Sequence, residues 1–115
     1  MWARLKSLVG FTADAIPSVA SATALPIPDN ATAIKITGTT AIASFDTGAG
    51  IQPGRILRVF GNDGTGSAFT DTAIASTSNG KLHLSASLTL ALGGNITFTQ
   101  WDNGAWQETA RSLNG

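Results

Sequence analysis

Short runs in which apolar and polar residues alternate fill the chain from residue 31 onward, and turn-forming residues separate these runs. In 33–37, 88–92 and 95–99, every second side chain is large and apolar, which is the pattern of a strand with one buried face. No pattern of helical length occurs after residue 30. This rhythm predicts an all-β fold, an antiparallel sandwich or barrel, and its irregular spacing argues against a solenoid.

Residues 1–30 differ in composition from the rest of the chain. Trp2, Leu5 and Leu8 recur at helical spacing, which predicts a short amphipathic helix. Residues 16–28 are rich in Ala, Ser and Thr and contain three prolines, which favours an extended arm. Such an arm lacks order, lies along its own domain, or anchors the chain to a neighbouring subunit, and the sequence leaves these alternatives open.

Charge and cysteine content exclude several functional classes. Seven basic residues balance seven acidic ones, and charged residues make up only 12% of the chain, so no basic face for nucleic acid is expected. The chain has no cysteine, which excludes disulfides and thiolate ligands, and it has no apolar run long enough to span a membrane. Asp14 and Pro17 follow the apolar patch at 8–11 closely, which argues against a cleaved secretory signal. A surface this poor in charge favours association.

The Asn-Gly pair at 103–104 joins the last two predicted strands and allows two hairpin registers. In a two-residue turn this pair forms the loop, and Trp101 and Trp106 both lie opposite the core. In a three-residue loop the glycine takes the left-handed bulge position, and Trp106 lies opposite Gln100. Because Phe98 marks the core face and Gln100 follows on that face, the alternation favours the three-residue loop. We therefore expect Trp106 in the core and Trp101 on the outer face, as a lone exposed residue or as a subunit contact.

No arrangement of residues in the sequence indicates catalysis or metal binding. His83 is the only histidine and alternates with leucines, as on the outer face of a strand, and nothing points to a nucleophile or an orienting carboxylate. Asp63, Asp71 and Asp102 lie near turn residues but lack the spacing of a calcium loop, so turn formation accounts for them. We expect a protein without enzymatic activity, cofactor or metal, and a small hydrolase is the least favoured alternative.

The last strand also carries charged residues whose partners the sequence does not decide. The spacing of Glu108 allows an ion pair with Arg55 or Arg58 on the sheet surface, or a salt bridge between subunits. Arg111 closes the same strand.

Four segments together resemble a small β-sandwich module of tailed-bacteriophage structural proteins. They are residues 38–45 (GTTAIASF), 54–60 (GRILRVF), 88–98 (LTLALGGNITF) and 102–112 (DNGAWQETARS). The last segment matches best, because the family ends on an aspartate-glycine turn followed by Trp, Glu and Arg. The turn at 93–95 keeps the aspartate of the family's corresponding turn only in part, as Asn.

The resemblance implies a homotrimeric, non-catalytic protein, with a jelly-roll-like antiparallel β-sandwich of about eight strands at 31–115 and an arm at 1–30. Because the chain is little more than this module and an arm, it looks like a capsid decoration (cement) protein. Such a protein binds the major capsid protein on the outer surface of the virion and stabilises the head, without a nucleic acid or membrane partner. The alternative is a tail-fibre or tailspike module for trimerisation or for binding a receptor or carbohydrate.

The residues expected to carry these roles fall into three groups. Anchoring of the arm to the capsid or to a neighbouring subunit is expected from Trp2, Leu5, Leu8 and Phe11. Contacts with subunits or partners are expected from Trp101, Arg55, Arg58, Glu108 and Arg111. The core is expected to contain Phe60, Leu90, Phe98 and Trp106.

Overall fold

The computed structural model describes residues 16–48, 50–72 and 78–113, and within these ranges the chain is all-β. The predicted helix near the N-terminus, with its four anchoring residues, lies outside the described ranges. No helix long and apolar enough to cross a membrane occurs in the described part of the chain. The strands are β1 (Ser18–Ala20), β2 (Ala24–Pro26), β3 (Ala33–Thr37), β4 (Ser44–Asp46), β5 (Ile56–Gly61), β6 (Ser67–Phe69), β7 (Leu82–His83), β8 (Leu88–Leu90), β9 (Asn95–Gln100) and β10 (Trp106–Ser112).

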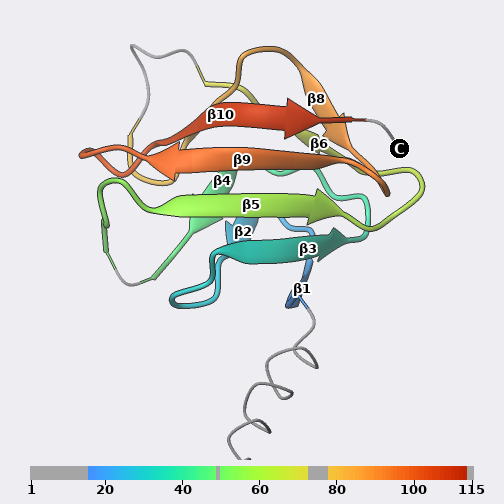
Figure 1. The fold of residues 1–115 in the computed structure, drawn as a ribbon, viewed down its shortest axis with the longest axis horizontal. Coiled ribbons are helices and arrows are strands. Elements are labelled where there is room, and N and C mark those ends of the chain that lie inside the picture. The colour runs from blue at the N-terminus through green and yellow to red at the C-terminus, as the bar shows by residue number, and fades with distance from the viewer. Residues whose placement is uncertain (1–15, 49, 73–77, 114–115) are drawn as a thin grey trace, which may run out of the picture.

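The largest layer is a six-stranded sheet in the order β1-β3-β5-β9-β10-β7. Its longer strands β3, β5, β9 and β10 lie side by side in Figure 1. β9 pairs antiparallel with β5 and β10, whereas β1, β3 and β5 run parallel and β7 runs parallel to β10. We call the side of this sheet that packs on buried residues the core face, and the opposite side the outer face.

The first half of the chain winds in a solenoid-like coil between this sheet and the two-stranded sheet β2-β4, which lies behind it in Figure 1. Strands β1 to β5 alternate between the two sheets, so the strands of successive coils stack in parallel. Buried apolar side chains consequently lie beside one another, as Val19 does with Ile36 and Leu25 with Phe45. Each coil covers the apolar side chains of the next.

The predicted uniformly antiparallel pairing is wrong, and the arrangement is solenoid-like where a jelly-roll-like sandwich was expected. Alternation predicts a strand and its buried face, but it carries no information about the direction of the neighbouring strand. Parallel neighbours need a connection that returns to the same end of the sheet, and here a short strand in the second sheet provides it. Val19 pairs with Ile36, 17 positions later, whereas Ile34 pairs with Val59, 25 positions later. Because the coils differ in length, the sequence shows no regular repeat.

Residues 16–27 of the expected arm pack along their own domain. β1 is the edge strand of the six-stranded sheet, β2 pairs with β4 in a two-stranded sheet, and Val19, Leu25 and Ile27 are buried in the common core. Pro26 is tolerated because β2 has a free edge, where a missing N–H costs no ladder hydrogen bond. With β1 and β2, the described residues form ten strands, more than the eight or so that the sequence predicts.

Aromatic rings form the centre of the core. The ring of Phe45 lies edge-on to Phe98, 5.0 Å between centroids, and 5.6 Å from Trp106. Leu90, Phe98 and Trp106, which the sequence assigned to the core, are buried. Phe60 was also expected there, but it is half-buried on the outer face, because the alternation along β5 turns its neighbour Val59 inward.

Candidate interaction surface

The β9–β10 hairpin has the three-residue loop that the alternation favours. The Trp101 N–H donates to the Ala105 carbonyl over 2.8 Å, the Gly104 N–H donates to the Trp101 carbonyl over 2.9 Å, and Gly104 has a φ of +88°. Trp106 consequently lies opposite Gln100. Trp106 is 0% exposed and Trp101 is 51% exposed, so the hairpin presents one tryptophan to each face of the sheet.

A second Asn-Gly turn, at 79–80, packs against the tip of this hairpin. The Gly80 N–H donates to the Gly104 carbonyl over 2.9 Å. A Cβ on Gly104 would lie 2.5 Å from Asn79 Oδ1 and 2.9 Å from Asn79 Cα, so a side chain does not fit there. The sequence signals each turn separately but does not signal their contact.

Gln100 is a buried polar residue that the sequence placed only at the end of the core face. Its Oε1 accepts a hydrogen bond from the Gln52 N–H over 3.0 Å, and its Nε2 donates to the Gly104 carbonyl over 3.2 Å. Because both ends of the amide have partners, its burial carries no unpaired polar group. The side chain joins the loop before β5 to the hairpin.

Arg55 forms its contacts within the chain. Its Nη2 donates to the carbonyls of Pro28 and Ala31 over 3.2 and 2.9 Å, and its guanidinium carbon lies 5.8 Å from the centroid of the Trp106 ring. These contacts fasten the segment before β3 over the buried tryptophan, with a cation–π contribution.

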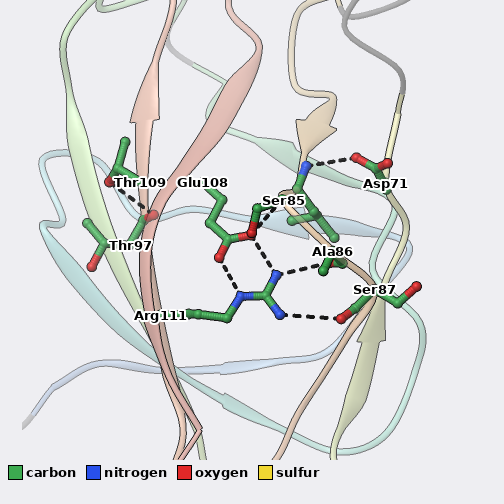
Figure 2. Close-up of polar contacts among 9 residues, drawn as sticks. Asp71, Ser85, Ala86, Ser87, Thr97, Glu108, Thr109 and Arg111 are labelled. Carbon is green, nitrogen blue, oxygen red and sulfur yellow. Dashed lines mark hydrogen bonds and ion pairs between the residues drawn. The ribbon is translucent and has the colours of Figure 1, made fainter.

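Glu108 pairs with Arg111 and not with the arginines near β5 that the sequence offered. The guanidinium is bidentate: Nε bonds to Oε2, and Nη2 bonds to Oε1 over 2.6 Å (Figure 2). In a regular strand, residues three apart face opposite sides. A β-bulge between Glu108 and Ala110 inserts Thr109 and returns Arg111 to the face of Glu108.

This ion pair also holds the loop before β8. The backbone N–H and the hydroxyl of Ser85 both donate to Glu108 Oε1 over 2.9 Å, and Arg111 donates to the carbonyls of Ala86 and Ser87 (Figure 2). The Glu108 side chain is only 4% exposed. The pair is therefore an internal clamp between β10 and this loop.

Two opposing effects act on the pKa of Glu108. Burial favours the neutral carboxyl, but hydrogen bonds from Arg111 and Ser85 together outweigh it, and the pKa is lowered from its ordinary value of 4.5. The hydrogen bond to Glu108 raises the pKa of Arg111. Because the folded pKa of Glu108 lies below the unfolded one, its contribution to stability is present above about pH 4.5 and is lost as the pH falls through the lowered value.

The outer face carries an apolar patch along β5, which we call the apolar groove. Ile56 is 56% exposed, and Phe60 lies two positions beyond Arg58 on the same side of the strand. Arg58 donates from Nε to the Thr97 hydroxyl over 3.4 Å. The groove is lined by Ile16, Thr32, Ala33, Ile56, Arg58 and Phe60.

A second patch on the outer face surrounds Trp101, and we call it the Trp101 platform. The indole Nε1–H donates to Gln107 Oε1 over 2.6 Å. The platform is lined by Thr99, Gln100, Trp101, Asp102, Gln107 and Thr109. Apart from Trp101, its lining residues have polar side chains.

The structure separates the five predicted contact residues into two groups. Arg58 and Trp101 lie on the outer face, although in different patches. Arg55, Glu108 and Arg111 each make two or more side-chain hydrogen bonds within the described part of the chain, whereas Arg58 and Trp101 make one each. The sequence missed the apolar groove because Phe60 was assigned to the core.

Contacts of His83 and of the turn aspartates hold loops in place. His83 Nδ1 lies 3.0 Å from the Thr72 carbonyl oxygen and 3.7 Å from the Asp71 carboxylate, which accepts from the Leu84 N–H over 2.7 Å. Asp63 accepts two N–H groups of its own loop over 2.8 and 3.3 Å. Within residues 16–48, 50–72 and 78–113, no group of three or more His, Cys, Asp or Glu side chains could hold a metal ion.

No protein-family model, curated protein or solved structure matches this chain.

Proposed function

We propose that this protein is a non-enzymatic structural protein that binds other proteins through the outer face of its six-stranded sheet. The observation that supports this most is the apolar groove. Ile16, Ile56 and Phe60 contribute apolar side chains to its lining, and Ile56 is 56% exposed. Arg58 at its side is the type of residue enriched at protein interfaces.

The groove is the proposed contact between copies of this chain, in a homotrimer. Charged residues make up only 12% of the sequence, so repulsion between copies is weak. Among the residues that line the groove, Arg58 alone is charged. Association there is then driven mainly by burial of apolar surface, and it should depend little on salt.

The proposed larger assembly is a virus capsid, with the trimer bound to the major capsid protein on the outer surface of the virion. The resemblance to tailed-bacteriophage modules supports this step. Ile16, where the described chain begins, lines the groove. The expected anchor residues Trp2, Leu5, Leu8 and Phe11 precede it.

The copy number of the chain in purified particles tests the capsid assignment. Quantitative mass spectrometry should find it in numbers comparable to those of the major capsid protein. A few copies per particle would instead place it on the tail, and absence from particles would end the proposal.

Deletion of residues 1–15 tests the anchor. We expect a folded protein that no longer decorates particles, because Val19 and Leu25 in the buried core remain. Full occupancy by the truncated protein would contradict the anchoring role. A cut beyond β2 is unsuitable, since it also removes core side chains.

A further inference from the structure

Trp101 carries an exposed indole ring that is held in one orientation. Its only ring donor is bonded to Gln107 Oε1 over 2.6 Å, yet about half of the residue, 51%, stays exposed. A tryptophan side chain has few torsions to immobilise, so this bond restricts the orientation of the ring. The ring is a preorganised flat apolar surface.

Residues with polar side chains line the same patch as this ring. The hydroxyls of Thr99 and Thr109 come from the two paired strands, and Asp102 comes from the turn. The Asp102 side chain is exposed. A carboxylate accepts up to four hydrogen bonds and forms strong ones.

This combination fits a sugar better than a protein surface. The C–H groups on one face of a pyranose ring are weakly positive and stack on the negative face of an aromatic ring. Its hydroxyls need donors and acceptors at the rim, which the platform has. A protein contact on a tryptophan gains most where apolar neighbours exclude water, and the apolar residues Ile56 and Phe60 line the other patch.

We propose that the Trp101 platform is a carbohydrate-binding site for a hexopyranose ring, stacked on Trp101 and hydrogen-bonded through its hydroxyls to Asp102 and Gln107. The site does not depend on the proposed capsid function, because its lining residues are not those of the apolar groove.

Two-dimensional ¹⁵N NMR of the full chain tests this proposal directly. The chain has three tryptophans and therefore three indole N–H signals, which single substitutions assign. Methyl β-D-glucopyranoside, methyl β-D-galactopyranoside and methyl α-D-mannopyranoside are titrated in turn, and a glycan array extends the set. We expect a saturable shift of the Trp101 signal with at least one glycoside, while the signal of buried Trp106 stays in place.

Variants separate stacking from a general change in the protein. Trp101→Ala should weaken binding about tenfold or more, as expected for loss of a stacking aromatic. Asp102→Asn should weaken it less, and Ile56→Ser in the apolar groove should leave it unchanged. Unchanged Trp106 signals in Trp101→Ala verify that the core is intact.

The proposal is overturned if no glycoside moves the Trp101 signal and the array shows no binding. It is also overturned if Trp101→Ala binds as well as the parent chain. If Trp101→Ala instead abolishes self-association while the glycosides have no effect, the residue is a protein contact.

Discussion

The core face and the outer face of the six-stranded sheet are made by the same strands but contain different kinds of residue. On the core face of the hairpin, Trp106 packs against the ring of Phe45 and has no exposed surface. On the outer face, Trp101 lies five positions earlier in the chain, is half exposed and has polar neighbours. The comparison shows that the hairpin register, and not the residue type, decides whether a tryptophan stabilises the fold or is available to a partner.

Truncation of the two tryptophans should separate the faces most strongly. Trp106→Ala removes the largest buried side chain and should lower the free energy of unfolding by about 3–5 kcal/mol. Trp101→Ala should change it by about 1 kcal/mol or less, because the ring packs on one side only. Urea denaturation followed by circular dichroism measures both. If both variants lost the same free energy of unfolding, Trp101 would stabilise the fold as much as Trp106 does, and the comparison of the two faces would be wrong.

Removal of Glu108 tests whether the bulge creates a structural clamp. Glu108→Ala leaves Arg111 and both donors of Ser85 without their acceptor and should cost about 2 kcal/mol. A double-mutant cycle with Arg111→Ala should give a clear coupling energy, of about 1 kcal/mol. A cost within the error of the measurement would show that the pair is only a surface feature.

Gly104→Ala tests the turn that assigns each tryptophan to its face. The substitution forces a side chain into a left-handed conformation and against Asn79, so we expect a loss of about 1–3 kcal/mol. Gly64→Ala is the matched control, because nothing lies within 4 Å of a Cβ there, and it should stay within about 0.5 kcal/mol. If thermal unfolding shows the same small effect for both, the contact between the two turns is unimportant.

The smallest expected effect is the pH dependence of the clamp. The parent chain should be more stable than Glu108→Gln at neutral pH, by about 1 kcal/mol. This difference should shrink below about pH 4.5, as Glu108 becomes protonated in both the unfolded and folded states. Denaturation at a series of pH values measures it. A difference that grows on acidification would contradict the lowered pKa.

Local patterns in the sequence predicted an all-β domain after residue 30, the hairpin register and the opposite placement of Trp101 and Trp106, but not the strands β1 and β2. They did not predict the parallel coils, since alternation is blind to the direction of a neighbour. They also missed the contact between the turns at 79–80 and 103–104, which brings together distant parts of the chain.

The errors at the predicted site have two separate origins. The sequence offered Arg55, Arg58 or another subunit as partners of Glu108 and missed Arg111, because the bulge at Thr109 has no glycine to mark it. Opposite charges three positions apart on a strand could have indicated such a bulge. Phe60 was placed in the core because its size was weighed above its register beside Val59.

Sedimentation velocity tests the central claim, that the apolar groove on the outer face joins copies of this chain. The parent chain should sediment as a trimer, and Ile56→Asp should sediment as a folded monomer, because it places a charge in the proposed interface. Ala110→Asp, an exposed change on β10 outside the groove, should remain a trimer. A parent chain that is monomeric at every concentration, or an Ile56→Asp variant that still forms trimers, would contradict the claim.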